Sequence, residues 1–170
     1  YSKNILGGRE AIPRMLDKFK EFNISVTWAS VGMAMCKNYK EWSEFVPKKI
    51  PKYKRQILSN YSYANLAKEH PKLFFGNDLL KIIMSYPNQE IATHSFSHIY
   101  FNEEGIDKQD MEIDLSFALE MANRNKISYS SIVFPRNQYN KLILDLLPSC
   151  GIKKYRGNLD YFLYRDGHYA

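Results

Sequence analysis

Apolar residues recur at helical spacing in two long stretches of the chain. From Arg9 to Asn23 they lie three or four positions apart, and Pro13 fits a first turn, where a missing N–H costs little. The stripe of this predicted helix comprises Ile12, Met15, Phe19 and Phe22. The pattern from Asp107 to Asn125 is the clearest, and its buried side comprises Met111, Leu115, Ala118 and Ala122, with Leu119 beside them.

A third helix is predicted nearer the C-terminus, from Asn137 to Leu147. Its inner face comprises Leu142, Ile143, Leu146 and Leu147, and Pro148 and Gly151 stop it. The tail from Leu159 is rich in Tyr and reads as loop.

Short apolar segments between these helices predict strands at residues 24–32, 90–93, 131–134 and 153–156. The first, ISVTWASVG, is almost continuously apolar, as expected for a strand covered on both faces. Because strands alternate with helices, we expect βαβ units and a parallel sheet, hence an α/β fold.

The connection from residue 33 to residue 89 is long, and we expect it to contain short helices. Within it, Asn77 is predicted to be the N-cap of a helix that buries Leu79, Leu80 and Ile83. We interpret residues 1–170 as one domain in which residues 33–89 form an insertion-like excursion.

Composition narrows the class of protein. Hydrophobic residues make up 45% of the chain, as in a globular protein, yet no run of 18 apolar residues predicts a membrane span. The first residues do not resemble a signal peptide, because they have no apolar core. Cys36 and Cys150 are expected to be buried free thiols, and no CxxC pair supports a thiolate zinc site.

The net charge is +6, and much of the excess lies between Lys37 and Arg55. Lysines interleaved with Tyr and Trp there could bind nucleic acid or an anionic glycan. We favour a solvated surface, and expect no nucleic-acid partner, because no nucleic-acid-binding fold is recognisable.

Polar clusters follow three predicted strands. They are His94-Ser95-Phe96-Ser97-His98, Pro135-Arg136-Asn137-Gln138 and Arg156-Gly157-Asn158. Because the carboxyl ends of parallel strands meet at one edge, where α/β active sites lie, we expect the three clusters to share one site.

His94 and His98 are the candidate metal ligands. Their spacing puts both imidazoles on one side of a helical turn, and imidazole suits zinc, cobalt, nickel or iron. Histidines at this spacing are also common as surface or capping residues, and the strand-end position favours metal. A catalytic zinc site needs a third protein ligand and an open position.

Arg136 leaves a predicted buried strand through a rigid Phe-Pro turn, so we expect its guanidinium to be aimed at a carboxylate. The alternative is a surface salt bridge. Glu103, Glu104 and Asp107 are expected to begin the next helix rather than bind metal. Asp166 and His168 lie near the C-terminus and are not favoured as site residues.

The His-Ser-Phe-Ser-His stretch resembles the second motif of the polysaccharide deacetylases, carbohydrate esterase family 4. Phe134-Pro135-Arg136-Asn137-Gln138 is similar to the third motif of one subfamily. The resemblance implies a distorted (β/α) barrel in which His94 and His98 bind a divalent metal, usually Zn²⁺. It also implies that Arg136 orients a catalytic aspartate, that Ser95 steadies the histidine loop, and that acetate is removed from an N-acetylated sugar.

Two parts of the family pattern are not found. The first motif, which supplies two acidic residues including the third metal ligand, an Asp, is expected upstream of Tyr1. The late histidine that protonates the leaving amine has no clear counterpart. We therefore expect a partial barrel without its N-terminal strand, weak metal binding, and an open sheet edge through which chains self-associate or which a rearranged terminus covers.

Two functions follow from the resemblance. The first is a metal-dependent hydrolase that removes N-acetyl groups from a polysaccharide or glycan precursor, inactive as this stretch alone. The alternative is a degenerate, non-enzymatic domain that binds glycan. The resemblance to signal-free subfamily members favours the cytoplasm, with an extracellular location left open. No residue is assigned to substrate binding from the sequence.

Overall fold

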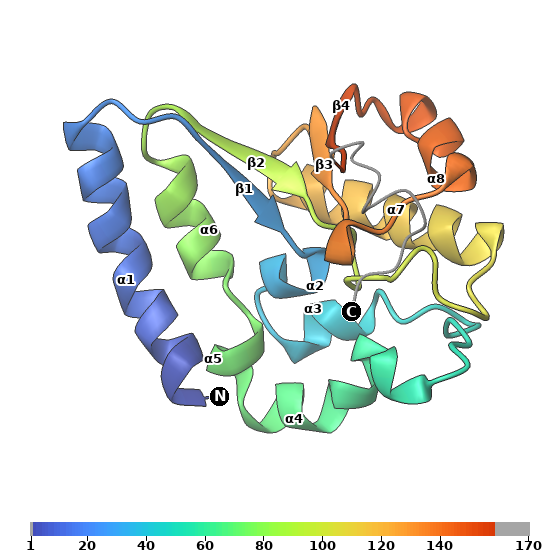
Figure 1. The fold of residues 1–170 in the computed structure, drawn as a ribbon. Helices are drawn as coiled ribbons and strands as arrows, with labels where there is room; N and C mark the ends of the chain where they lie inside the picture. The colour runs from blue at the N-terminus through green and yellow to red at the C-terminus, as the bar shows by residue number, and fades with distance from the viewer. Residues whose placement is uncertain (1, 159–170) are drawn as a thin grey trace.

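The computed structural model describes residues 2–158, and its centre is a four-stranded parallel sheet. The strands follow one another in chain order across the sheet (Figure 1): β1 (Val26–Ser30), β2 (Gln89–Thr93), β3 (Ser131–Val133) and β4 (Lys154–Arg156). All three pairings are parallel. The predicted α/β class and parallel sheet are therefore confirmed.

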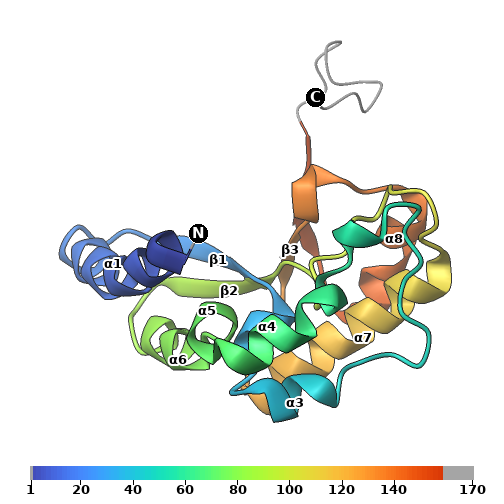
Figure 2. The same ribbon diagram turned by 90° about the horizontal axis from the view of Figure 1, so that it is seen from below.

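Helices of very different lengths connect the strands. They are α1 (Ser2–Glu21), α2 (Gly32–Met35), α3 (Tyr39–Ser43), α4 (Ala64–Glu69), α5 (Pro71–Phe74), α6 (Asn77–Met84), α7 (Lys108–Arg124) and α8 (Lys141–Leu146). Short 3₁₀ turns span Gln56–Leu58, Asn60–Tyr63, Pro135–Asn137 and Pro148–Cys150. Seen from below, α6 and α7 lie on the same side of the strands (Figure 2).

Helix α7 agrees closely with its prediction. Asp107 is the N-cap and forms a capping box with Asp110, which satisfies amide groups that the first turn leaves free. The expected inner residues are buried: Met111, Leu115, Ala118 and Ala122.

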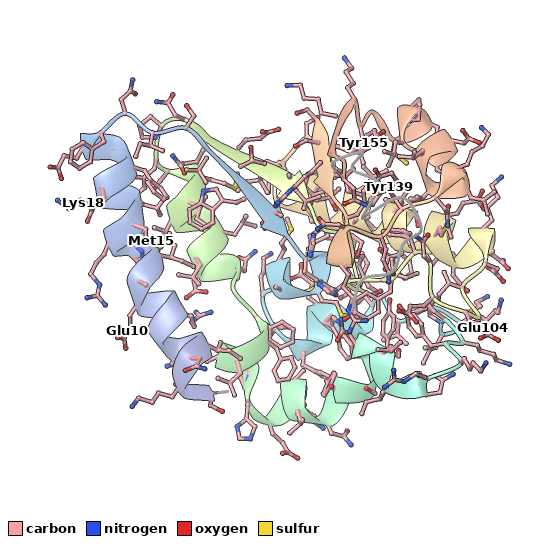
Figure 3. The ribbon with its side chains drawn as sticks, viewed as in Figure 1. Glu10, Met15, Lys18, Glu104, Tyr139 and Tyr155 are labelled. Carbon is pink, nitrogen blue, oxygen red and sulfur yellow. The ribbon has the colours of Figure 1, made fainter. Side chains whose placement is uncertain are left out.

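Helix α1 differs from its prediction in both extent and face. It begins at Ser2, so Pro13 lies inside the helix rather than in its first turn. Leu16 is its one fully buried residue, whereas Met15 and Phe22 are 44% and 65% exposed. Figure 3 shows Glu10, Met15 and Lys18 along this helix at the periphery of the molecule. The predicted stripe was partly wrong because α1 packs against α5 and α6 with Leu16 buried, while Met15 and Phe22 stay exposed.

Strand β1 is not covered on both faces, contrary to the prediction. Its residues alternate between half-buried and exposed, and Thr27 and Ala29 are exposed. Trp28 points the other way, and its ring lies 6.4 Å from that of Phe19 on α1. Among residues 2–158, β1 pairs with β2 alone and forms one edge of the sheet.

The connection between β1 and β2 contains the expected short helices and also contributes to the core. Trp42, Phe45 and Tyr53 are each less than 5% exposed, so these three aromatic residues of the basic stretch are buried rather than free to stack on bases. Asn77 is not the N-cap of α6, because Gly76 holds that position. The buried Asn77 amide instead donates to Met35 O and to Asn125 Oδ1.

The helix predicted from Asn137 is shorter. Residues 135–137 form a 3₁₀ turn, and α8 begins after Asn140, whose side chain accepts a hydrogen bond from Ile143 N. Ile143 and Leu147 are buried as expected, but Leu142, in the first turn of α8, is 49% exposed.

Cys36 and Cys150 are both free thiols, as predicted, although Cys150 is only partly buried. Within residues 2–158, no helix is both long enough and apolar enough to cross a membrane.

Candidate metal-binding site

The loop that carries the two histidines continues directly from β2. His94 N donates to Ser30 O, so the β1–β2 ladder extends one residue beyond the strand. The segment is not the helical turn that the spacing suggested, because Ser95 and His98 have positive φ angles of 62° and 56°. Ser95 Oγ accepts a hydrogen bond from Ile99 N at 3.0 Å, which agrees with the expected role of Ser95 in steadying the loop.

The two imidazole rings meet despite the different backbone. Their centroids are 4.8 Å apart, with an interplanar angle of 65°. His94 Nδ1 lies 2.6 Å from Val133 O. A carbonyl oxygen can only accept a hydrogen bond, so Nδ1 of the neutral His94 ring carries the proton. Nε2 then keeps a free lone pair, which is the arrangement found at metal-binding histidines.

The environment keeps both rings neutral. Burial lowers the pKa of His94. Burial, followed by the charge of a protonated His94 and that of Arg136, lowers the pKa of His98 to about 4. A neutral imidazole is the form that binds a metal ion, so the pair is ready for one at neutral pH.

The carboxylate of Asp114 holds the loop between His94 and His98 in place. This carboxylate on α7 is 3% exposed and accepts hydrogen bonds from Phe96 N, Ser97 N and Ser97 Oγ. Burial raises the pKa of Asp114, while these donors favour the ionised form. Sequence reasoning missed Asp114, although a carboxylate between Met111 and Leu115 on an apolar helix face is a signal of such a role.

Gly32, the first residue of α2, allows the chain just after β1 to lie close to the histidine loop. Gly32 N donates to Ser95 O, and a Cβ atom at Gly32 would lie 2.5 Å from Phe96 Cδ2 and 2.9 Å from Phe96 Cα. A side chain at this position would therefore displace the loop between the histidines.

Arg136 comes to the same edge from the turn after β3. Its guanidinium carbon lies 4.2 Å from the centroid of the Tyr100 ring, and Nη1 lies 3.6 Å from Glu103 Oε1. Tyr100 in turn packs edge-on against His98, with centroids 5.2 Å apart. Arg136, with φ at 52°, is thus stacked on Tyr100, but its side chain is 52% exposed, and its ion pair with Glu103 agrees with the surface salt bridge given as the alternative. Its predicted role toward a catalytic aspartate stays a prediction, since the carboxylate beside it is Glu103.

The polar cluster after β4, residues 156–158, contacts the polar cluster after β3, residues 135–138. Asn158 donates to Asn137 O through its side chain and to Tyr139 Oη through its backbone N–H. Tyr139 and Tyr155 lie together above the end of the sheet (Figure 3), with ring centroids 5.5 Å apart. The clusters that follow β2, β3 and β4 therefore converge at one edge, as the strand order predicted.

The histidine pair fits part of a metal site. Zinc held at about 2.0–2.1 Å by two ring nitrogens with a tetrahedral angle would set the ring centroids roughly 5 Å apart, close to the separation here. Within residues 2–158, no three His, Cys, Asp or Glu side chains are grouped so that they could hold a metal ion.

The nearby acidic residues have other partners. Asp107 caps α7 and pairs with Lys49, and Glu104 pairs with Lys54. Glu103 and Glu104 lie in the turn before α7 rather than in its first turn. Asp166 and His168 lie outside the described residues.

The comparisons with known proteins agree with this architecture. No family model and no curated protein sequence matches the chain. The solved structures that match it include three of one carbohydrate esterase family 4 pseudoenzyme. A mutant form has a TM-score of 0.56 and 15% identity, with 88% of this chain and 40% of that chain covered.

The wild-type protein from Bacillus anthracis gives a TM-score of 0.55 at 15% identity, over 87% of this chain and 38% of that one. A mutant with restored enzymatic activity gives 0.52 at 13% identity, over 88% and 40%. The chain thus spans about 40% of the length of these structures. At such low identity the match shows the fold alone, and it confirms that this chain has part of the distorted (β/α) fold of the carbohydrate esterase family 4 deacetylases, as its motifs predicted.

Proposed function

We propose that this chain supplies two metal ligands of a metal-dependent hydrolase that removes N-acetyl groups from a polysaccharide or glycan precursor. The observation that carries the proposal is the pairing of His94 and His98 beyond β2, with their ring centroids 4.8 Å apart and the tautomer of His94 fixed by Val133 O.

In this proposal each polar side chain has a separate task. His94 and His98 hold the ion through ring nitrogens, and the hydrogen bond to Val133 O keeps the His94 ring in place. When bound, a divalent ion such as Zn²⁺ supplies Lewis acidity that polarises an amide carbonyl and makes a water molecule more acidic. Arg136, held against Tyr100, orients the carboxylate that takes the proton of the attacking water.

The proposal predicts weak, histidine-dependent zinc binding by this chain. Two imidazoles without a third ligand leave the shell incomplete, so isothermal titration should give affinity weaker than micromolar. His94→Ala and His98→Ala should each abolish the measurable heat, whereas His70→Ala, at an exposed site between α4 and α5, should not change it.

Either of two results would contradict this assignment. Zinc binding that survives loss of both His94 and His98 would place the metal elsewhere. Sub-micromolar affinity would mean that a third ligand exists outside the described residues of this same chain.

A second candidate function is glycan binding without catalysis by a degenerate deacetylase domain. Two observations favour it: the similar solved structures are pseudoenzymes, and residues 2–158 contain no complete ligand set. Such a domain would bind N-acetylated oligosaccharide equally well with and without zinc, whereas a hydrolase would release acetate only with the metal.

A further inference from the structure

A pocket of about 400 Å³ lies beside the candidate site, between the end of β1, the α4–α5 segment and His98. Its floor is formed by buried side chains, among them Trp42, Ala67 and Phe75. Its size falls within the range of pockets that bury small organic ligands.

Among residues 2–158, none of those that line this pocket is charged, although charged residues make up 25% of the chain. Its walls are aliphatic and aromatic, and include Met33, Leu73 and Phe74. A sugar ring buried here would lack partners for several hydroxyl groups, and each unpaired hydroxyl would weaken binding. The pocket is therefore better suited to a neutral apolar group than to a sugar ring.

The lining also includes the polar side chains of Asn60, Tyr63, His98 and Tyr100. Asn60 lines the pocket and donates to Ser97 O, and Tyr100 lies beside His98. A ligand that fills the pocket thus has its apolar part among the aromatic side chains and a polar end next to His98. An amide fits this description if its carbonyl lies at the histidines and its acyl chain extends into the pocket.

We propose that the pocket binds the acyl chain of an N-acylated amino sugar, and that it accepts chains longer than acetyl as well as acetyl itself. This inference rests on the proposed function for the reacting group, but its binding part can be tested without metal. In the reaction, water adds across the amide C–N bond: the acyl carbon gains the hydroxyl group and leaves as a carboxylic acid, and the nitrogen gains the proton and leaves as a free amine.

The test is calorimetric binding of N-acyl glucosamines, from acetyl to octanoyl, to this chain without metal and below their micellar concentrations. Affinity should rise by up to about fourfold for each added methylene until the pocket is filled. Ala34→Trp, which places a large ring in the pocket lining, should remove this gain, and Ser116→Trp, on the exposed face of α7, should preserve it.

Equal affinity for acetyl and octanoyl derivatives would overturn the proposal, as would a gain that Ala34→Trp leaves intact. Octyl glucoside, which carries its chain on the anomeric oxygen, should bind more weakly, and equal binding would overturn the assignment to the N-acyl group. If Ala34→Trp does not fold, the chain-length series and the glucoside comparison in the unaltered protein decide the matter. A failure of zinc to bind His94 and His98 would reject the proposed hydrolase without affecting these affinities.

Discussion

Asp114 and the histidine loop depend on each other at the scale of single residues. Three donors of the loop converge on one buried carboxylate, and two loop residues have left-handed backbone angles that are costly without such support. The position of His98 relative to His94 is therefore set by a residue on another element, α7.

Removal of the Asp114 carboxylate should destabilise the protein strongly. Asp114→Ala leaves Phe96 N and Ser97 N buried without acceptors, at a cost of about 1–3 kcal/mol for each group. Urea unfolding should show the loss, and zinc affinity should fall with it. Asp145→Asn, an exposed residue paired with Lys141, is the matched control and should change stability by less than about 0.5 kcal/mol. A stable Asp114→Ala protein with unchanged zinc affinity would show that the loop is set elsewhere.

Zinc binding by the histidine pair should persist well into the acid range. Because the pKa of His98 is lowered to about 4, protons compete with the metal only as the pH falls toward that value, rather than near 6.5. For the same reason His98 contributes stability that is present above pH 6.5 and is lost as the pH falls toward 4. Proton NMR titration of the imidazole signals, alongside zinc affinity between pH 4 and 7, measures both effects. A His98 midpoint near 6.5 would refute the expectation.

At the scale of elements, the outer edge of β1 has no partner strand among residues 2–158. Val26 N donates to Asn88 O and His94 N donates to Ser30 O, so the even-numbered residues face β2. Thr27 and Ala29 therefore direct their backbone N–H and C=O groups away from the sheet. Such an edge is a template for another strand.

We predict that this edge mediates self-association of the chain. Gel filtration and sedimentation over a wide concentration range should show oligomers, and Ala29→Lys should shift the protein toward monomer because a charge on an edge strand opposes pairing. Ser116→Lys adds the same charge on α7 and should have little effect. A soluble monomer at every concentration would rule out the edge as an interface.

At the scale of the whole molecule, the chain covers 40% of the solved structures that share its fold, so catalysis is predicted for a longer polypeptide. A protein extended upstream of Tyr1, supplied with zinc and an N-acetylated oligosaccharide, should release acetate. Arg136→Lys should lower the rate by about 10- to 100-fold, because lysine keeps the charge but loses the planar contact that orients a carboxylate.

The control for this substitution is Arg124→Lys at the end of α7, where the arginine pairs with Glu44 and Glu120. Assay of released acetate decides the outcome. A protein that binds zinc and oligosaccharide without releasing acetate would support the non-enzymatic function instead.

The sequence was sufficient for features that depend on neighbours along the chain. The extent and apolar face of α7, the parallel sheet and the convergence of three polar clusters all follow from local spacing and from the geometry of βα units. For the same reason the errors lie where distant contacts decide burial: on α1 and β1, at Asn77 and at Leu142.

The sequence by itself thus determined which residues stand at the carboxyl edge of the sheet, His94, His98 and Arg136 among them. Only the tertiary structure decided how they are held, because the Val133 carbonyl, the Asp114 carboxylate and the Tyr100 ring come from segments far apart in sequence or from an irregular loop. The apolar pocket beside His98 is likewise a product of packing. Its walls come from segments between Val31 and Tyr100 that no periodicity brings together.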